Sequence, residues 1–306
     1  MRDLNLTTLR YFVAVCDAGS LTRAAEQENI VTSALSKRLA QLEEDLSTVL
    51  MERGRRGVLL TPAGETLLEH SRAILGSARR ISEDMKAYGN GVRGKVHLLG
   101  TASAISESLA DDVSAFMKLP EHREIQVDIQ EAVSQEIVRR IREGSASIGV
   151  LWDAADLRGL SHMPYRTDRL AVVVHPDHPL ARLNECSFDD TLAYEHVGLE
   201  SASAVNVMMA RAAALVGKRM RYRAQVSTFE SALRIIRANL GIAVIPQEVV
   251  QAYGDLVKLR IIALTEPWAP RRFVICRHAE KPLPTAAALL ASYLEFVACQ
   301  QPTQSG

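Results

Sequence analysis

From Lys95 onward, the chain alternates short apolar runs with amphipathic helical runs. KVHLLG at 95–100 and ASIGVLW at 146–152 have the pattern of buried strands, and SQEIVRRIREG at 134–144 has that of a helix. Repeated strand–helix–strand units build sheets of mostly parallel strands, so the pattern predicts an α/β fold. DAADLRG at 153–159 divides it into two sets. We therefore expect two α/β lobes with a ligand cleft beyond the carboxyl ends of their strands.

The second set contains strands and helices of the same kind and closes with a long helix at 284–298. A chain of 306 residues with 47% hydrophobic residues is long enough to bury the cores of two domains. The expected strands of this set lie at 169–175, 196–199, 221–226, 242–246 and 271–278, and its other helices at 207–217 and 228–240.

The first sixty residues have a different, helix-dense pattern. After a first amphipathic helix, Gly19 supplies a break and Ser20 a cap for a short second helix. A third helix follows at 32–46 after a brief connection, which is the spacing of a helix-turn-helix. Next, LMERGRRGVLLT at 50–61 predicts a β-hairpin whose tip carries Arg53, Arg55 and Arg56.

The third helix carries short hydroxyls and two cations on one face: Thr32, Ser33, Ser36, Lys37 and Arg38. Taken alone, this face is as compatible with solvent as with DNA. The basic hairpin tip favours DNA, because it can reach phosphates or the minor groove while the helix enters the major groove. The formal net charge of the chain is zero, so the basic surface is local.

A long helix is predicted to start at Thr61, as its cap, and Pro62. Its apolar and small residues step by alternating four and three positions, which is a heptad seam. The glycine-rich stop at 89–94 favours an exposed, dimerising linker over a core helix of one domain. The seam consists of Leu67, Ser71, Ile74, Ala78, Ile81, Met85 and Tyr88.

Three segments in order, SLTRAAE at 20–26, ALSKRLAQLEEDL at 34–46 and LMERGRRGVLLTPAGE at 50–65, resemble the LysR-type transcriptional regulators. HPDHPL and NLGIAVIP continue the resemblance in the second half. It implies an α/β multidomain protein with a winged helix-turn-helix, a dimerising linker helix and a two-lobed effector-binding domain that resembles periplasmic solute-binding proteins. In that family, a tetramer is often built as a dimer of dimers.

The expected boundaries are a DNA-binding domain at 1–61, a linker helix and hinge at 62–94, a two-lobed domain at 95–299 and a disordered tail at 300–306. One departure from the family concerns the start of the third helix. Val31, Thr32 and Ser33 stand where serine, glutamine and proline are common. Thr32 offers a hydroxyl and a methyl group that can touch a thymine methyl, so base readout is expected to differ.

Seven residues are candidates for the effector cleft. Thr101 and Ser103 follow the first strand at a helix amino terminus, which attracts anions. Ser227 and Glu230 have capping-box spacing, which leaves Thr228 free to face the cleft. Each candidate alone is more often a cap or core residue, and the resemblance places them together around the cleft. The candidates are Thr101, Ser103, Ser134, Trp152, Ser201, Ser203 and Thr228.

No cation is evident among these candidates, which favours an effector with one carboxylate on a small body, aromatic bodies included. The chain contains no G-x-S-x-G, Walker or H-E-x-x-H motif, so we expect neither an enzyme nor a cofactor. His175 and His178 lack partners with ligand spacing, so no metal is expected. The four cysteines form no CxxC pair, which argues against a zinc ribbon and a disulfide framework.

No signal segment and no apolar run of ~20 residues is present, so a cytoplasmic protein without membrane contact is expected. The predicted function is a DNA-binding transcriptional regulator that responds to a small-molecule effector. Its expected partners are double-stranded promoter DNA, the effector, a second copy through the linker helix, a homotetramer and, as a candidate, RNA polymerase. The two alternative functions are a solute-binding or transport module and an enzyme with a regulatory head. The DNA-binding head argues against the first alternative, and the lack of a catalytic motif in the chain argues against the second.

Overall fold

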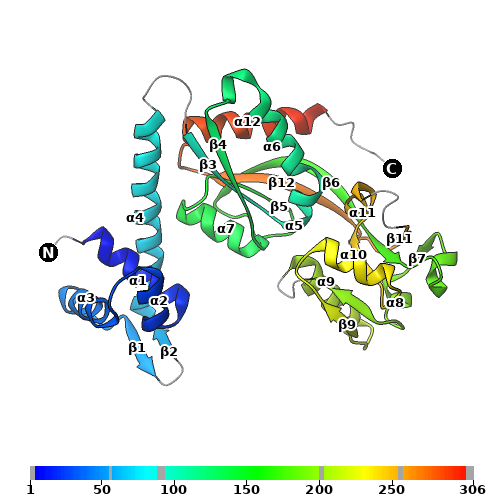
Figure 1. Cartoon of the computed structure of the whole chain (residues 1–306), viewed down its shortest axis with the longest axis horizontal. Coiled ribbons are helices and arrows are strands. Elements are labelled where there is room, and N and C mark those ends of the chain that lie inside the picture. The colour runs from blue at the N-terminus through cyan, green and yellow to red at the C-terminus, as the bar shows by residue number, and fades with distance from the viewer. Residues whose placement is uncertain (1–3, 55–56, 88–93, 200–202, 254–257, 301–306) are drawn as a thin grey trace. The chain divides into compact units, whose positions relative to one another are not determined.

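The computed structural model describes residues 4–54, 57–87, 94–199, 203–253 and 258–300 (Figure 1). The chain divides into two compact units. The first comprises residues 1–91 together with 142–146, and the second comprises 92–141 and 147–306. Among the described residues, no helix combines the length and the apolar character that crossing a membrane requires.

The first unit begins with three short helices and a hairpin. The helices are α1 (Leu6–Ala18), α2 (Leu21–Gln27) and α3 (Thr32–Asp45), and the antiparallel hairpin consists of β1 (Met51–Gly54) and β2 (Gly57–Leu60). Asn5 and Ser20 cap α1 and α2 by accepting bonds from backbone N–H groups. The helices enclose an apolar core around Phe12, Leu35 and Leu39. The predicted winged helix-turn-helix is confirmed.

Helix α4 (Pro62–Ala87) follows the hairpin, and Thr61 Oγ1 accepts a bond from Gly64 N at 3.1 Å, as a cap does. Of the predicted seam, Leu67 packs against the core of the first unit. Farther along, 39% of Ile74 and 62% of Ile81 is exposed in the single chain. The side chain of Met85 and the whole of Tyr88 lie outside the described residues.

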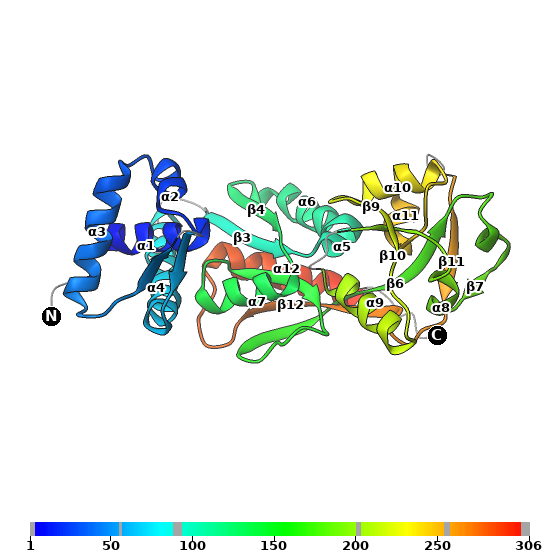
Figure 2. The ribbon, with the colours of Figure 1, turned by 90° about the horizontal axis from the view of Figure 1, so that it is seen from below.

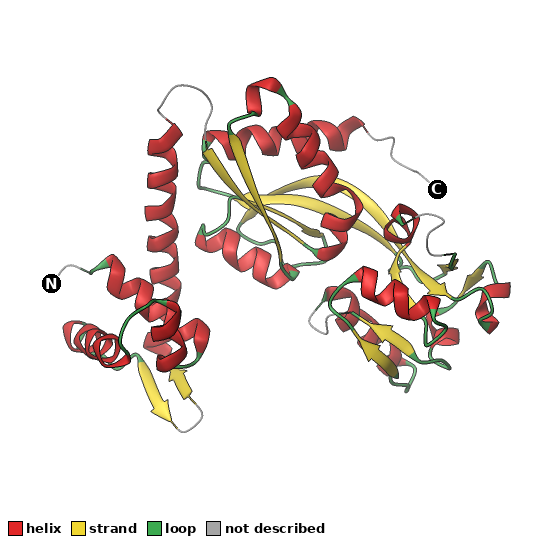
Figure 3. Ribbon diagram, in the orientation of Figure 1, coloured by secondary structure: helices red, strands yellow, loops and turns green. Residues whose placement is uncertain are grey.

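The second unit contains the two predicted lobes. In the first lobe, β3 (Gly94–Gly100) lies between β4 (Ile125–Glu131) and β5 (Ile148–Trp152), and all three strands are parallel. Helices lie on both sides of these strands (Figure 3). They are α5 (Ala102–Ala104), the π-helical turn η1 (Ile105–Leu109), α6 (Ala110–Lys118), the turn η2 (Pro120–His122), α7 (Ser134–Glu143) and α12 (Thr285–Gln300).

Two strands cross from one lobe to the other. They are β6 (Leu160–Val174) and β12 (Pro270–His278), which pair antiparallel, and β12 also pairs antiparallel with β5. The far end of β6 pairs antiparallel with β10 (Ala243–Pro246) and β11 (Arg260–Leu264). The expectation of mostly parallel strands therefore holds for β4-β3-β5 but is wrong for the strands around β6.

The second lobe completes the unit. Seen from below, α10 and α9 lie on opposite sides of it (Figure 2). Its apolar interior includes Leu170, Val172, Val244 and Ile262. The remaining elements are η3 (Pro179–Arg182), β7 (Glu185–Cys186), α8 (Phe188–Thr191), β8 (His196–Gly198), α9 (Ala204–Leu215), β9 (Tyr222–Gln225), α10 (Phe229–Arg237) and α11 (Gln247–Ala252).

The predicted tail began at Gln300, which is instead the last residue of α12. Residues 301–306 lie outside the described part of the chain.

Candidate functional site

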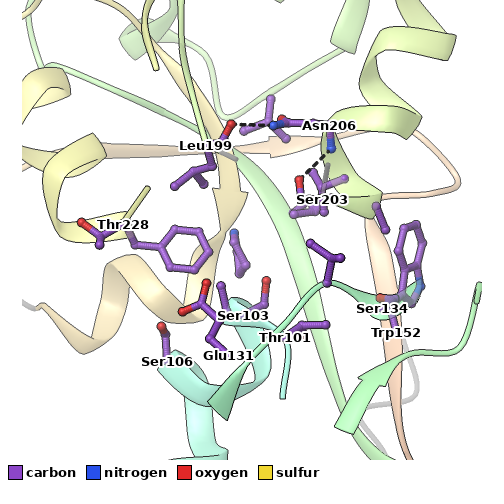
Figure 4. A pocket seen from close by; sticks show the side chains of 18 of the residues that line it. Thr101, Ser103, Ser106, Glu131, Ser134, Trp152, Leu199, Ser203, Asn206 and Thr228 are labelled. Atoms are coloured by element: carbon purple, nitrogen blue, oxygen red, sulfur yellow. Dashed lines mark hydrogen bonds between the residues drawn. The ribbon is translucent and has the colours of Figure 1, made fainter. Parts of the chain in front are cut away.

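A cavity of about 260 Å³ opens between the two lobes of the second unit (Figure 4). Its wall combines hydroxyl groups with aromatic rings and comes from both lobes and from the crossing strand β12. The lining residues that matter below are Thr101, Ser103, Ser134, Trp152, Ser203, Asn206, Thr228, Arg271 and Phe273. A site of this size and mixed character suits a small organic molecule.

Six predicted effector residues lie in this wall: Thr101, Ser103, Ser134, Trp152, Ser203 and Thr228. The seventh, Ser201, lies outside the described residues. Sequence segments that are up to 127 positions apart thus meet at one cavity, because each segment follows a strand end or starts a helix. Whether these residues bind an effector stays a prediction.

Thr101 and Ser103 lie where β3 gives way to α5. The backbone N–H of Thr101 donates to Val150 O at 3.1 Å, which fixes the turn to the neighbouring strand. The hydroxyl of Thr101 is buried and has no hydrogen-bond partner within the described part of the chain. Ser103 is buried as well. A buried hydroxyl without a hydrogen-bond partner is unfavourable. A ligand that forms a hydrogen bond with Thr101 would remove this cost, which would favour its binding.

The capping-box prediction for Ser227 is wrong. The cap of α10 is Thr228, whose Oγ1 accepts a bond from Ser231 N at 3.2 Å and donates to Ser231 Oγ at 2.9 Å. The helix starts one residue later than that motif requires, and Glu230 instead bonds to Arg234 at 2.7 Å. Thr228 therefore lines the cavity while its hydroxyl is already engaged.

Ser203, at the start of α9, likewise lines the cavity and caps a helix. Its Oγ accepts a bond from Asn206 N at 3.2 Å, and Asn206 Nδ2 donates to Leu199 O at 2.7 Å (Figure 4). These bonds hold the helix start against the strand end that also borders the cavity. Asn206 was not among the predicted residues, since an asparagine inside a helical pattern gives no signal of its own.

Arg271 contradicts the expectation of a cleft without a cation. It lines the cavity on β12, and only 4% of the residue is exposed. Its guanidinium carbon lies 5.8 Å from the centroid of the Trp152 ring and 5.1 Å from that of Phe273. The sequence did contain a signal for this buried cation, which was the alternation of side chains along a strand. Adjacent Arg271 and Arg272 must face opposite sides of the sheet, so only one of them can reach solvent.

Three carboxyl groups, those of Glu107, Asp168 and Glu248, form a cluster whose nearest oxygens lie within 4.8 Å of one another. Arg271 Nε donates to Asp168 Oδ1 at 2.7 Å, and a terminal nitrogen of Arg271 donates to Asp168 Oδ2. The same side chain lies 3.9 Å from Glu107. The carboxyl groups have a spacing that suits a divalent cation, but Arg271 already supplies positive charge to two of them, Asp168 and Glu107.

Burial raises the pKa of Glu107 far above its ordinary value, and the hydrogen bond with Asp168 raises it further. Burial also raises the pKa of Glu248. Glu107 comes from the first lobe, Glu248 from the second and Asp168 from the crossing strand β6. The cluster thus places Glu107, whose carboxyl has a raised pKa, beside the Arg271–Asp168 ion pair at the place where the lobes join.

The candidate DNA face lies on α3 of the first unit. Ser33, Lys37 and Arg38 are exposed, whereas Thr32 and Ser36 are half-buried. The guanidinium of Arg38 lies 5.7 Å from the centroid of the Tyr11 ring. At the hairpin, the backbone of Arg53 pairs with Val58, but its side chain is not described, and Arg55 and Arg56 lie outside the described residues. The α3 part of the predicted surface is therefore accessible.

His175 and His178 have local structural partners. His178 Nδ1 accepts a bond from Leu180 N at 3.2 Å and so caps the turn η3. His175 Nδ1 accepts a bond from Asp177 N at 3.1 Å. Each ring therefore stabilises the turn that contains it.

Two family models match the chain. The one described as "LysR substrate binding domain" matches residues 89–297, and "Bacterial regulatory helix-turn-helix protein, lysR family" matches residues 6–65. A curated relative from Escherichia coli (strain K12), the uncharacterized HTH-type transcriptional regulator YbhD, is 25% identical over 288 residues, which cover 92% of this chain and 88% of the relative.

Solved structures share the fold. Full-length CbnR in complex with its target DNA has a TM-score of 0.65 at 22% identity, and the match covers 96% of this chain and all of CbnR. The effector-binding domain of QuiR in complex with shikimate has a TM-score of 0.59 at 15% identity, and the match covers 68% of this chain and 99% of that domain.

Proposed function

The chain belongs to the LysR family of bacterial regulatory helix-turn-helix proteins, and we propose that a small carboxylate in the interlobe cavity controls how this transcriptional regulator engages its promoter. The observation that carries the proposal is the lining of that cavity by both lobes and a crossing strand. A ligand that contacts both lobes favours one lobe arrangement over others, which is the condition for coupling. We assign ligand binding, and no catalysis, to this cavity. This assignment agrees with relatives of the chain that are transcriptional regulators.

For DNA, we assign the exposed face of α3 to the major groove. Thr32, Ser33, Ser36, Lys37 and Arg38 contribute there, and Arg53, Arg55 and Arg56 of the hairpin are assigned to phosphates or the minor groove. The exposure of Ser33, Lys37 and Arg38 supports this assignment. CbnR, which has the same fold, binds its target DNA in the solved complex.

For assembly, we assign helix α4 to a homodimer and two such dimers to a tetramer. The exposure of Ile74 and Ile81 supports the first assignment, because apolar residues on a heptad seam are stabilised by a partner helix. A dimer presents two DNA-binding faces, which fits a promoter with two half-sites.

For the effector, we propose a single carboxylate. The unpartnered Thr101 hydroxyl and the buried Ser103 hydroxyl are neutral donors for it. Arg271 adds a donor at the wall, but Asp168 neutralises its charge, and Glu131 adds a carboxylate to the lining. A wall with so little net positive charge disfavours molecules with several negative charges.

A thermal-shift screen tests the effector proposal with mono-, di- and tricarboxylates, sugars and amines. A ligand at ~100 times its dissociation constant adds ~2.7 kcal/mol to the free energy of unfolding. Thr101→Val and Ser103→Ala should abolish the shift that a monocarboxylate gives. Ser114→Ala on α6 is the matched control, since that hydroxyl bonds to Ala110 O outside the cavity lining. Stabilisation by amines or sugars alone contradicts the carboxylate proposal and leaves the family assignment intact.

A further inference from the structure

Helix α3 starts with a residue that is poorly suited to its position. Val31 is the N-cap residue, and its side chain provides no capping hydrogen bond. In the same domain, Asn5 caps α1 at 2.9 Å and Ser20 caps α2 at 3.5 Å. Valine is among the weakest N-cap residues, because it offers no acceptor to the free N–H groups of the first turn. The helix therefore lacks a stabilising bond that its two neighbours have.

Burial does not compensate for the missing cap. Val31 is 70% exposed, although burial of its methyl groups would be favourable. The apolar core of the domain takes Leu35, Leu39 and Leu42 from α3, and Val31 is not among its members. Val31 therefore contributes neither a cap nor core packing to the free domain.

The surroundings of Val31 indicate what could cover it. Ser33 and Ala34, the exposed neighbours in the first turn, are small, so another surface can approach the helix start closely. The next turn exposes Lys37 and Arg38, whose charges complement phosphates. In helix-turn-helix proteins, the first residues of the recognition helix meet base edges in the major groove. The apolar group displayed there is the 5-methyl of thymine.

We propose that Val31 is a specificity-determining residue that packs its methyl groups against the 5-methyl of a thymine in each half-site. The inference rests on the DNA face proposed above and assigns to it a residue outside the predicted set. In this account, valine at position 31 provides no cap for the helix but makes an apolar contact with the DNA. Serine, a good N-cap residue, cannot make that contact. Ala34 lies next to that contact and leaves it room.

The test uses duplexes selected from a random library by the full-length protein. Each thymine of a half-site is replaced in turn by deoxyuridine, which removes the 5-methyl and keeps the base pair. We expect the wild-type protein to lose about fourfold in affinity at one thymine per half-site, which is the factor for one methyl-sized apolar group. Replacements elsewhere in the half-site should have smaller effects.

Val31→Ser separates readout from folding. Serine should cap α3 as Ser20 caps α2, so the melting temperature should rise, while DNA affinity falls and the deoxyuridine penalty disappears. Lys37→Ala should weaken binding to all duplexes and keep the penalty. Thr32→Ser removes only the threonine methyl, and this variant should keep the deoxyuridine penalty too.

The outcomes separate this inference from the proposed DNA interface. A wild-type protein that selects DNA but shows no deoxyuridine penalty overturns the role of Val31 alone. A penalty that persists in Val31→Ser, or that vanishes in Thr32→Ser instead, assigns the methyl contact to another residue and overturns the inference as well. Failure of the wild-type protein to select any duplex overturns both proposals.

Discussion

Arg271 and Asp168 form a buried ion pair at the point where β12 and β6 lie side by side between the lobes. The two residues are direct partners in the antiparallel register, and Arg271 Nε lies 2.7 Å from Asp168 Oδ1. Only 4% of each residue is exposed. The pair therefore joins the two crossing strands directly beside the candidate effector cavity.

Breaking this ion pair from one side should destabilise the second unit strongly. Arg271→Met leaves the Asp168 carboxylate buried without its cation, which costs about 3–5 kcal/mol of unfolding free energy. The double variant Arg271→Met with Asp168→Leu should recover most of this loss, because it buries no uncompensated charge. Urea denaturation of the wild-type protein, both single variants and the double variant measures the coupling. Additive losses contradict the account.

Glu107 should make the protein less stable as the pH rises. Its folded pKa is raised above the ordinary value of 4.5 by burial and by Asp168. Above about pH 4.5, the unfolded state releases a proton that the folded state keeps, so stability falls with pH by at most about 1.4 kcal/mol per unit. Glu107→Gln cannot ionise, and its stability relative to the wild-type protein should increase between pH 5 and 8 in urea titrations. A constant difference across this range would show that Glu107 is ionised in the folded state.

Helix α4 should lose its partner when its seam carries a charge. Ile81, which is 62% exposed in the single chain, is expected to be covered in the dimer. Ile81→Asp buries a carboxylate there without a partner, so light scattering should report a lower mass than for the wild-type protein. Glu69→Asp, at an exposed α4 position outside the predicted seam, is the control and should keep the wild-type mass. An unchanged mass for Ile81→Asp would show that the seam does not hold the subunits together.

The cysteines should differ sharply in reactivity. Burial raises the pKa of Cys16 to about 12, of Cys186 to about 11 and of Cys276 to about 12, so these thiols form little thiolate near neutral pH. Cys299 is exposed on α12. A thiol-reactive dye at pH 8 should modify one cysteine per chain rapidly, and Cys299→Ser should remove that phase. Rapid modification of two or more cysteines contradicts the burial argument.

The sequence predicted those parts of the fold whose signal is local. Amphipathic periodicity marked helices such as α3 and α4, and unbroken apolar runs marked buried strands such as β5. The first half of β6 was missed because LSHMPYRTD at 160–168 is polar and contains Pro164. It becomes a strand by pairing with β12, more than a hundred residues later, and no local pattern encodes such a partner.

The candidate cavity was predictable in its hydroxyls but not in its charges. Thr101 and Ser134 stand at strand ends and helix starts, which a sequence reveals. The position of Arg271 depends on which face of β12 turns inward, and the raised pKa of Glu107 depends on groups from three other elements. Such long-range electrostatic arrangements are set by the tertiary structure alone.

The central claim, that effector binding and DNA binding are coupled, is tested most directly by a thermodynamic cycle. DNA affinity of the full-length protein is measured with and without the carboxylate that raises its melting temperature, and carboxylate affinity is measured with and without DNA. The account predicts the same factor in both comparisons, typically about 5–150-fold for coupled sites, and a factor of one for DNA binding by Thr101→Val. A carboxylate that binds the wild-type protein in the cavity yet leaves its DNA affinity unchanged would contradict the account.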